Sequence, residues 1–216
     1  MHSPSTLLTP AFFNRDPRRV ARSLLGKVLI RKTARGILSG RIVETEAYLG
    51  AGDAAAHSAA GKTARNSVLF GPPGFAYVYF IYGNYYCLNV SCLPDGVAGG
   101  VLFRALEPLT GIKQMAAGRG LEVPGPEDLK KLPWLRKISS GPGLMCEAFG
   151  VTRARDNGKN FVSARSDLQI ADDGYRVRRV AVGPRIGITK AASEPLRYLI
   201  ANNPYVSVPL GPRVKV

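Results

Sequence analysis

Short apolar or alternating stretches, bounded by turn residues, recur along this chain and are typical of β-strands. Helical patterns are shorter and do not alternate regularly with the strands, which argues against a doubly wound parallel sheet. We therefore predict a mixed α+β fold with a mostly antiparallel sheet. The segments with a strand pattern are 27–31, 36–49, 75–82, 85–93, 100–107, 177–182, 184–189 and 196–200.

Helix signals are clearest near the N-terminus. Asp16 is a suitable N-cap, Pro17 suits a first helical turn and Gly26 suits a helix end, so a helix is expected between them. Weaker patterns predict helices over 108–118 and 126–132, and a helix that begins at the run 141–143 with Ser140 as its cap.

One β-hairpin is signalled by Gly83-Asn84, a dipeptide that favours a two-residue turn. Ideal pairing across this turn puts Asn89 opposite Val78, on the face of Tyr82 and away from Tyr79. A site that contains both Asn89 and Tyr79 therefore requires a bulge or a different pairing.

The same hairpin contains five of the nine tyrosines of the chain. An aromatic ladder most often packs a sheet. Tyr82, beside the turn, has little to pack against, and on a basic protein such a side chain can wedge between base steps of a duplex. Tyrosines deeper in the hairpin can stack on a base. Sheet packing and nucleic-acid recognition both stay open at this point.

The segment RIVETEAY places Glu44, Glu46 and Tyr48 on one face of a strand. This face is either a solvated surface or a site, and the pattern does not tell which glutamate matters. Arg104 interrupts the apolar strand VLFRALEP, where a buried guanidinium needs an anionic partner. Glu44 or Glu46 is a candidate partner, and an exposed face is the alternative.

Two glycine-rich segments are candidate binding loops. Residues 50–66 are small and polar without a period, and a structureless loop of this length is usually functional. This loop contains His57, the only internal histidine. The run SSGPG opens a helix and can present backbone N–H groups to a phosphate, although it matches neither the P-loop nor the dinucleotide fingerprint. Our candidate nucleic-acid contacts in these segments are Lys62, Arg65, Gly141 and Gly143.

Composition narrows the class of protein. With 216 residues, 45% hydrophobic and 21% charged, we expect one folded domain over residues 1–216, with a mobile N-terminus over residues 1–9. The chain has no apolar run of about 18 residues and no signal-peptide pattern, so neither a membrane span nor secretion is expected.

Cysteine and histidine usage points to a cytoplasmic protein without a metal. Cys87, Cys92 and Cys146 are odd in number and contain no C-x-x-C pair, so we expect reduced thiols rather than a disulfide framework. The only histidines are His2 and His57, which argues against a structural zinc site.

The charge points to a polyanionic partner. The chain has 30 Lys+Arg against 15 Asp+Glu, a formal net charge of +15 at pH 7. The basic residues are scattered, so the charge belongs to the folded surface. Phosphate neutralisation supplies most non-specific affinity for nucleic acids, which favours a nucleic acid over a merely solvated face. Binding to an anionic membrane is less favoured, because the sequence contains no amphipathic anchor.

Together these segments resemble the alkyladenine (3-methyladenine) DNA glycosylase family. The resemblance implies a single domain with a curved, open-barrel-like antiparallel sheet ringed by helices, and a protruding hairpin. It also implies excision of alkylated or deaminated purines from duplex DNA. It rests on RIVETEAYLG (41–50), His57, TARN (63–66), YVYFIYGNYYCLN (77–89) and LFRALEP (102–108), and extends more weakly to SGPGLMCEAFGV, RIGIT and EPLRYLI, covering roughly residues 10–210.

The resemblance also implies roles for single residues. Glu46, in TEAY, matches the catalytic glutamate and Arg104 the arginine beside it, whereas Glu44 has no assigned role. Tyr82 matches the tyrosine that fills the gap left in the duplex. The residues that match the flipped-base pocket are Tyr48, His57, Tyr79 and Asn89, of which Asn89 screens purine substituents.

These matches predict a hydrolysis. The damaged nucleotide is rotated out of the duplex, and Glu46, held ionised by Arg104, activates a water that attacks C1′ of the sugar, which leaves an abasic site. No metal or organic cofactor is expected. No lysine lies within the motifs, which predicts a monofunctional enzyme without a lyase step. We expect a monomer bound to double-stranded DNA with damaged purines, in the cytoplasm, or on the nucleoid of a prokaryote.

Two alternatives stay open. A non-catalytic module that kinks damaged DNA with Tyr82 explains the charge and the hairpin but leaves Glu46 and Tyr48 without a role. An RNA-modifying or RNA-binding protein would also use a basic surface and stacking tyrosines.

Overall fold

Strand β3 (Gly36–Tyr48) organises the sheet, because three other strands pair with it. Strand β6 (Gly100–Thr110) pairs along one edge. Along the other edge, β2 (Val28–Thr33) pairs with the first half of β3 and β9 (Arg197–Ile200) pairs with Glu44–Glu46. The register with β6 shifts on both sides of Glu44, and such a bulge bends a strand and changes the aim of its side chains.

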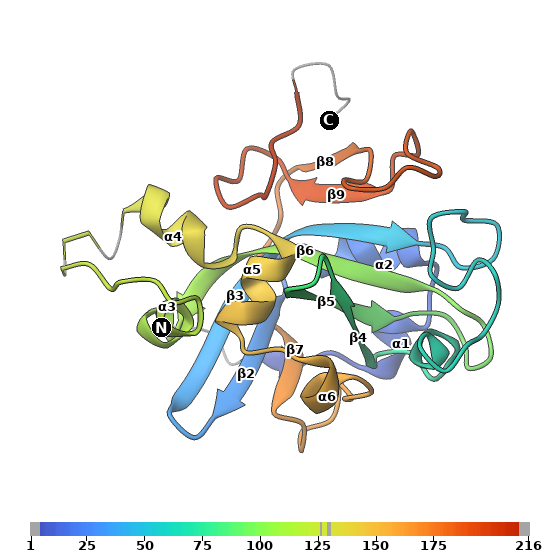
Figure 1. Cartoon of the computed structure of the whole chain (residues 1–216), viewed down its shortest axis with the longest axis horizontal. Coiled ribbons are helices and arrows are strands. Elements are labelled where there is room, and N and C mark those ends of the chain that lie inside the picture. The colour runs from blue at the N-terminus through green and yellow to red at the C-terminus, as the bar shows by residue number, and fades with distance from the viewer. Residues whose placement is uncertain (1–4, 126, 129–130, 212–216) are drawn as a thin grey trace.

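The sheet is antiparallel throughout and open. The computed structural model describes residues 5–125, 127–128 and 131–211, and in this part of the chain the strand order is β1-β7-β2-β3-β6-β5-β4, with β8 paired to β9 (Figure 1). This confirms the predicted mixed α+β fold with an open, antiparallel sheet. The remaining strands are β1 (Thr6–Leu7), β4 (Ala76–Ile81), β5 (Tyr85–Ser91), β7 (Leu168–Asp172) and β8 (Val180–Gly183).

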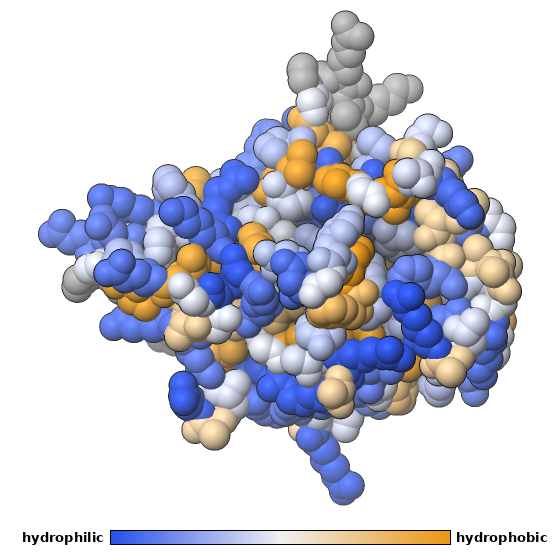
Figure 2. Space-filling view, viewed as in Figure 1, coloured by the Kyte–Doolittle hydropathy of each residue, from blue (hydrophilic) through white to orange (hydrophobic). Residues whose placement is uncertain are grey.

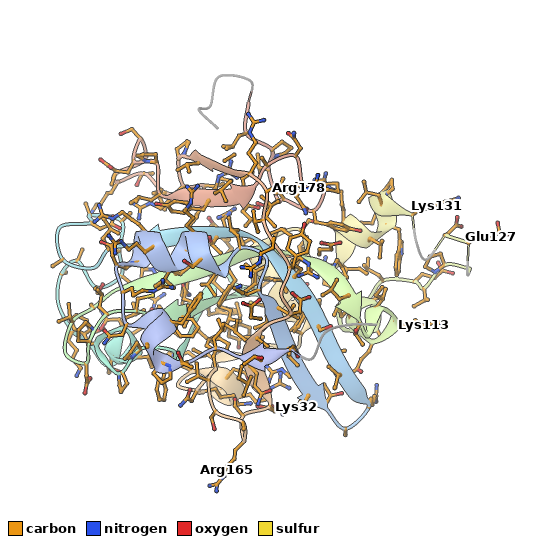
Figure 3. All side chains as sticks on the ribbon, turned by 180° about the vertical axis from the view of Figure 1, so that it is seen from behind. Lys32, Lys113, Glu127, Lys131, Arg165 and Arg178 are labelled. Atoms are coloured by element: carbon orange, nitrogen blue, oxygen red, sulfur yellow. The ribbon has the colours of Figure 1, made fainter. Side chains whose placement is uncertain are left out.

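Short helices cover both faces of the sheet. In Figure 1, α5 (Pro142–Ala148) lies in front of β5 and β6, whereas α2 (Pro17–Leu24) lies behind β3; the view from behind in Figure 3 brings α2 forward. The buried side of α2 carries Val20, Ala21 and Leu24, spaced for one helical face. The other helices are α1 (Pro10–Phe13), α3 (Ile112–Gly118), α4 (Leu132–Ser139), α6 (Arg153–Asp156) and the 3-10 helix η1 (Ser67–Phe70).

Several predicted elements differ from the structure. Residues 108–110 continue β6, because the chain leaves the strand only at Gly111, whose φ of 79° suits glycine. The N-cap of α5 is Gly141 rather than Ser140, and it makes no side-chain capping hydrogen bond. Residues 184–189 form no strand. The predicted helix over 126–132 falls partly on 126 and 129–130, which lie outside the described residues; α4 begins at Leu132.

The N-terminal helix agrees with its sequence signals. The Asp16 side chain accepts a hydrogen bond from the backbone N–H of Arg18, Pro17 occupies the first turn and Gly26 has a φ of 84°. Upstream, β1 pairs with β7, while residues 1–4 lie outside the described part of the chain, so the mobility of residues 1–9 stays a prediction.

All three cysteines are buried and unpaired. No helix in residues 5–211, leaving aside the undescribed positions, is long and apolar enough to cross a membrane. Basic side chains are spread around the molecule rather than gathered in one tail. Figure 3 shows this at the outer edges of the fold, where the labelled cations are Lys32, Lys113, Lys131, Arg165 and Arg178.

Candidate active site

A cavity of about 490 Å³ opens where the β4–β5 hairpin, the loop 50–66 and the start of α5 meet. Its volume lies in the range of small-molecule sites. The predicted site residues that line it are Tyr48, His57, Tyr79, Tyr82, Asn89, Arg104, Gly141 and Gly143. Residues separated by almost 100 positions in the sequence therefore share one cavity.

Glu46 is fully buried and is not itself among the residues that line the cavity, but its carboxylate contacts three residues that do, Tyr48, Arg104 and Ile186. Its Oε2 accepts a hydrogen bond from the Tyr48 hydroxyl at 3.0 Å, and its Oε1 accepts one from the Ile186 backbone N–H at 2.8 Å. The Arg104 guanidinium lies 3.1 Å from the same Oε1. The interpretation of this strand face as a solvated acidic surface is wrong, because Glu44 is also fully buried.

Burial dominates the protonation of Glu46 and raises the pKa of its carboxyl above the ordinary value. Arg104, the Ile186 N–H and the Tyr48 hydroxyl favour the charged form and offset part of this effect, while the charge of Glu44 adds to it. Arg104 lowers the pKa of Glu46, as predicted, but burial raises it by more.

Arg104 bridges the two glutamates. Its Nε donates to Glu44 Oε1 at 3.2 Å, and Nη1 pairs with Glu46, so both predicted partners are used. Arg104 is only 6% exposed, which rules out the alternative of a solvated arginine. Burial alone would lower the pKa of Arg104, but the two carboxylates raise it, so the guanidinium keeps its charge.

Tyr48 has a cation behind its ring. The Arg185 guanidinium carbon lies 4.7 Å from the ring centroid, and Arg185 forms a buried ion pair with Asp53 at 2.6 Å. Burial disfavours the Asp53 carboxylate, but Arg185 and the N–H groups of Leu49 and Ala55 hold its pKa below the ordinary value. This pair fastens the start of the loop 50–66 to the segment whose next residue, Ile186, binds Glu46.

His57 is positioned by two tyrosines. Its Nδ1 lies 3.0 Å from the Tyr77 hydroxyl, and its ring meets Tyr79 edge-on with centroids 4.5 Å apart. Desolvation and the nearby charge of Arg65 lower the pKa of His57, so the neutral ring is favoured near pH 7. Arg65 itself lies 5.9 Å from the Tyr79 ring centroid.

The hairpin register differs from the prediction. Asn89 pairs with Tyr77 rather than with Val78, so Asn89 lies on the same strand face as Tyr77 and Tyr79. The loop has three residues, 82–84, instead of two. This is the different pairing that a shared pocket required. Asn89 is fixed there because its Nδ2 donates to the Tyr77 carbonyl at 3.2 Å.

Tyr82 lies in this loop and not on a strand face. Its φ of 53° is unusual for a tyrosine, and the residue is 76% exposed. It nevertheless borders the cavity, contrary to its predicted place on the opposite face of the hairpin. An aromatic side chain at the mouth of a cavity has the exposure needed to enter a duplex.

The candidate DNA contacts have different positions. Gly141 and Gly143, at the start of α5, line the cavity, whereas the exposed Lys62 does not. Arg65 is exposed as well, but its guanidinium reaches toward the Tyr77–Tyr79 wall. No group of three or more potential metal ligands occurs among the described residues.

Sequence reasoning missed the groups that hold the carboxylates in place. Arg185 and Ile186 lie in a segment predicted to be a strand, and Asp53 was one polar residue in a loop without a pattern. Arg197 and Ser207, which bind Glu44, come from the C-terminal region. Of these groups, Arg197 could have been found from the sequence, because it lies within the apolar strand LRYLI and a buried arginine there requires an acidic partner.

Comparisons with known proteins agree with this geometry. The family model described as "Methylpurine-DNA glycosylase (MPG)" matches residues 11–204. A protein of Koribacter versatilis is 66% identical over 200 residues, covering 93% of this chain and 92% of its own. A Burkholderia cenocepacia protein is 46% identical, covering 94% and 92%, and one from Methanocella arvoryzae is 44% identical, covering 91% and 93%. All three are named "Putative 3-methyladenine DNA glycosylase".

Proposed function

Because the chain belongs to the methylpurine-DNA glycosylase family, we propose that it flips alkylated or deaminated purines out of duplex DNA and hydrolyses their N-glycosidic bonds. Membership confirms the resemblance inferred from the motifs and makes the chain a DNA-binding glycosylase in the repair of alkylated bases. The observation that carries the finer proposal is a buried carboxylate, Glu46, held beside an aromatic-walled cavity.

Base flipping is supported by the cavity and its walls. A base inside a duplex is out of reach, so the nucleotide must leave the stack at a cost of a few kcal/mol. Tyr48 and Tyr79 line the cavity and favour electron-poor rings, since cation–π attraction to an alkylated, positively charged purine is worth about 0.5–2 kcal/mol. His57 and Asn89 supply polar groups for base recognition, and Asn89 screens purine substituents.

Glu46 acts as the general base. In its ionised form it accepts a proton from a water that attacks C1′, while its charge stabilises the oxocarbenium-like sugar in the transition state. Arg104 and the Ile186 N–H orient the carboxylate. A second carboxylic acid is not needed because an alkylated purine leaves readily, unlike the alcohols released by sugar hydrolases.

Tyr82 fills the space that the flipped nucleotide leaves. Its exposure at the hairpin tip supports this role, and stacking on neighbouring bases offsets part of the cost of flipping. Lys62, Arg65 and the backbone at Gly141 and Gly143 contact the DNA around the lesion.

The enzyme acts as a monomer, needs no cofactor and leaves an abasic site without cutting the strand. No lysine is among the residues described as lining the cavity, so no amine is placed to form a Schiff base there. 3-Methyladenine is expected among the substrates, as the names of the relatives suggest. A non-catalytic kinking module would leave the buried Glu46 without a role.

The direct test is Glu46→Gln on a labelled duplex that contains hypoxanthine or an alkylated adenine. We expect the single-turnover rate of base release, read as alkali-labile abasic sites, to fall at least about 10²-fold, because general base catalysis supplies roughly 10²–10⁴. Duplex affinity should be retained. Wild-type excision by Glu46→Gln would disprove the base assignment, and absence of base release by the wild-type protein would disprove the activity.

Tyr82→Ala tests the wedge. Loss of one stacking contact, worth about 1–3 kcal/mol, should weaken excision from a paired lesion by roughly 5- to 150-fold while changing undamaged-duplex affinity much less. Phe80→Ala is the matched control, because Phe80 lies on the same hairpin, is 47% exposed and packs on Tyr86 away from the cavity. Equal losses of excision and binding in Tyr82→Ala would show a structural role only.

A further inference from the structure

Glu44, two residues before the proposed catalytic glutamate, accepts four hydrogen bonds. Its Oε1 accepts hydrogen bonds from Arg104 Nε, from Arg197 Nη1 at 2.8 Å and from the Ser207 hydroxyl at 3.0 Å. Its Oε2 accepts one from the Ser207 backbone N–H at 2.6 Å. Like Glu46, neither Glu44 nor Arg197 lines the cavity, but Glu46 contacts three residues that line it, whereas Glu44 contacts one, Arg104.

The register of β3 brings this cluster together. Glu44 pairs with Ala105 of β6 between two register shifts, which leave Val43 and Arg104 without a partner in this ladder, and it also pairs with β9, the strand that begins at Arg197. The other Arg197 contact, from Nη1 to the Val208 carbonyl at 2.9 Å, holds the same C-terminal segment that supplies Ser207. A buried charge pair is thus formed between β3 and β9, next to Arg104.

We propose that Glu44 and Arg197 form a positioning pair that leaves the charge of Arg104 available to Glu46 and so sets the ionisation of the catalytic carboxylate. Two buried carboxylates share two buried arginines, and all four are less than 7% exposed. Arg197 balances Glu44. Without Arg197, Arg104 would have to compensate both glutamates; without Glu44, two cations would act on Glu46 alone.

The other groups near Glu46 do not duplicate this pair. Three other groups act electrostatically on Glu46: Tyr48 at the end of β3, Cys87 on β5 and Arg185 in the segment after β8. Helix α2 packs against the opposite face of β3, where Thr45 donates to the Ala21 carbonyl. Glu44 and Arg197 are the charged side chains that continue the ion-pair network from Arg104, among the described residues.

The inference rests on the proposed role of Glu46 as a base, whose activity falls as the pH drops and the carboxyl becomes protonated. The acidic midpoint of the single-turnover excision rate therefore reports the ionisation of Glu46. Glu44→Gln removes a negative charge and should lower this midpoint, whereas Arg197→Met removes a positive charge and should raise it. A charge within about 4–6 Å shifts the pKa of an acid by roughly 1–3 units, and we expect a smaller shift, of about 0.5–1 unit, from charges that lie beyond Arg104. Opposite shifts in one cluster are not expected from a loss of structure.

Two further variants sharpen the test. Arg197→Lys keeps the charge and should leave the midpoint closer to wild type than Arg197→Met does. Arg41→Met is the matched control: Arg41 lies on the same strand, is paired with Asp173 at 2.9 Å and is five residues before Glu46. It should lower stability without moving the midpoint.

Each outcome is decisive. Unchanged midpoints in both folded variants, or shifts in the same direction, overturn the proposal. If one of the two does not fold, as judged by circular dichroism, the other is compared with wild type and Arg41→Met. If both fail to fold while Arg197→Lys folds, the charges of the pair are needed for the fold itself, and the proposal of a positioning pair for catalysis is wrong. Wild-type excision by Glu46→Gln would instead refute the base role of Glu46 on which this inference rests, and absence of base release by the wild-type protein would refute the proposed function.

Discussion

At the scale of single residues, the site keeps a carboxylate where burial favours the neutral acid. Glu46 is fully buried, and its three donors only partly compensate the loss of water. A group that is useful for catalysis and unfavourable for the fold is typical of active sites. The consequence can be measured as stability.

Glu46→Gln should therefore stabilise the protein near neutral pH. The folded-state pKa of Glu46 is raised above its unfolded value, so the folded protein binds the proton more tightly, and stability is lost as the pH rises between these two values. Glutamine mimics the protonated acid and avoids this loss. We expect thermal denaturation to give a higher Tm for the variant at pH 7–8, by about 2–4 °C for each kcal/mol gained, and a difference that shrinks toward pH 4.5. A variant less stable at every pH would contradict the raised pKa.

How much of the site the sequence predicts depends on the kind of contact. Arg104 was predictable as a partner of Glu44 or Glu46, because a buried guanidinium within an apolar strand needs a carboxylate. The family motif then distinguished Glu46 from Glu44. The Ile186 N–H was not predictable, since any residue has a backbone donor and only the path of the irregular segment 184–189 aims this one at Glu46.

At the scale of elements, α5 and the β4–β5 hairpin approach each other closely at Gly143. A Cβ on Gly143 would lie 2.7 Å from Cδ1 and 3.0 Å from Cβ of Tyr85, the first residue of β5. Glycine lowers helix propensity, so its presence within α5 has a packing reason that is separate from any contact with DNA.

Gly143→Ala should therefore destabilise the protein despite the better helix propensity of alanine. We expect the free energy of unfolding in urea to fall by about 1–3 kcal/mol, as overpacking typically costs. Gly141→Ala is the matched comparison, because its Cβ would meet only the flexible Leu144 side chain at 3.3 Å or more, and its stability should change by less than about 0.5 kcal/mol. Equal stabilities of the two variants would remove the packing explanation.

The same elements show where sequence patterns stop being sufficient. The two strands of the hairpin were predictable from their apolar runs, but the register was not, because Gly83-Asn84 favours a two-residue turn and the chain uses Tyr82 as a third loop residue. The observed pairing differs from the predicted one by one residue, which places Asn89 on the same face as Tyr79. Strand β7 was missed because LQIAD is short and is flanked by polar residues on both sides.

At the scale of the whole molecule, the positive charge lies on the surface. Among the described residues, the buried acidic and basic side chains are four arginines and four carboxyl groups, whose formal charges cancel one another. The excess of 15 positive charges therefore belongs to residues outside the buried set. Figure 2 agrees, since hydrophilic residues cover much of the face on which α5 lies.

This division of charge predicts that salt separates binding from chemistry. Affinity for a duplex should fall steeply with salt, because each neutralised phosphate releases a counterion; about six contacts give a loss of roughly 10³-fold between 50 and 200 mM. The rate of excision in the saturated complex should hardly change, because the ion pairs of Glu46, Arg104 and Glu44 are buried and weakly screened. Fluorescence anisotropy gives the affinity, and single-turnover rates at saturating protein give the chemical step. A saturated rate that falls in parallel with affinity would mean that the Glu46 carboxylate is open to solvent ions, contrary to its burial.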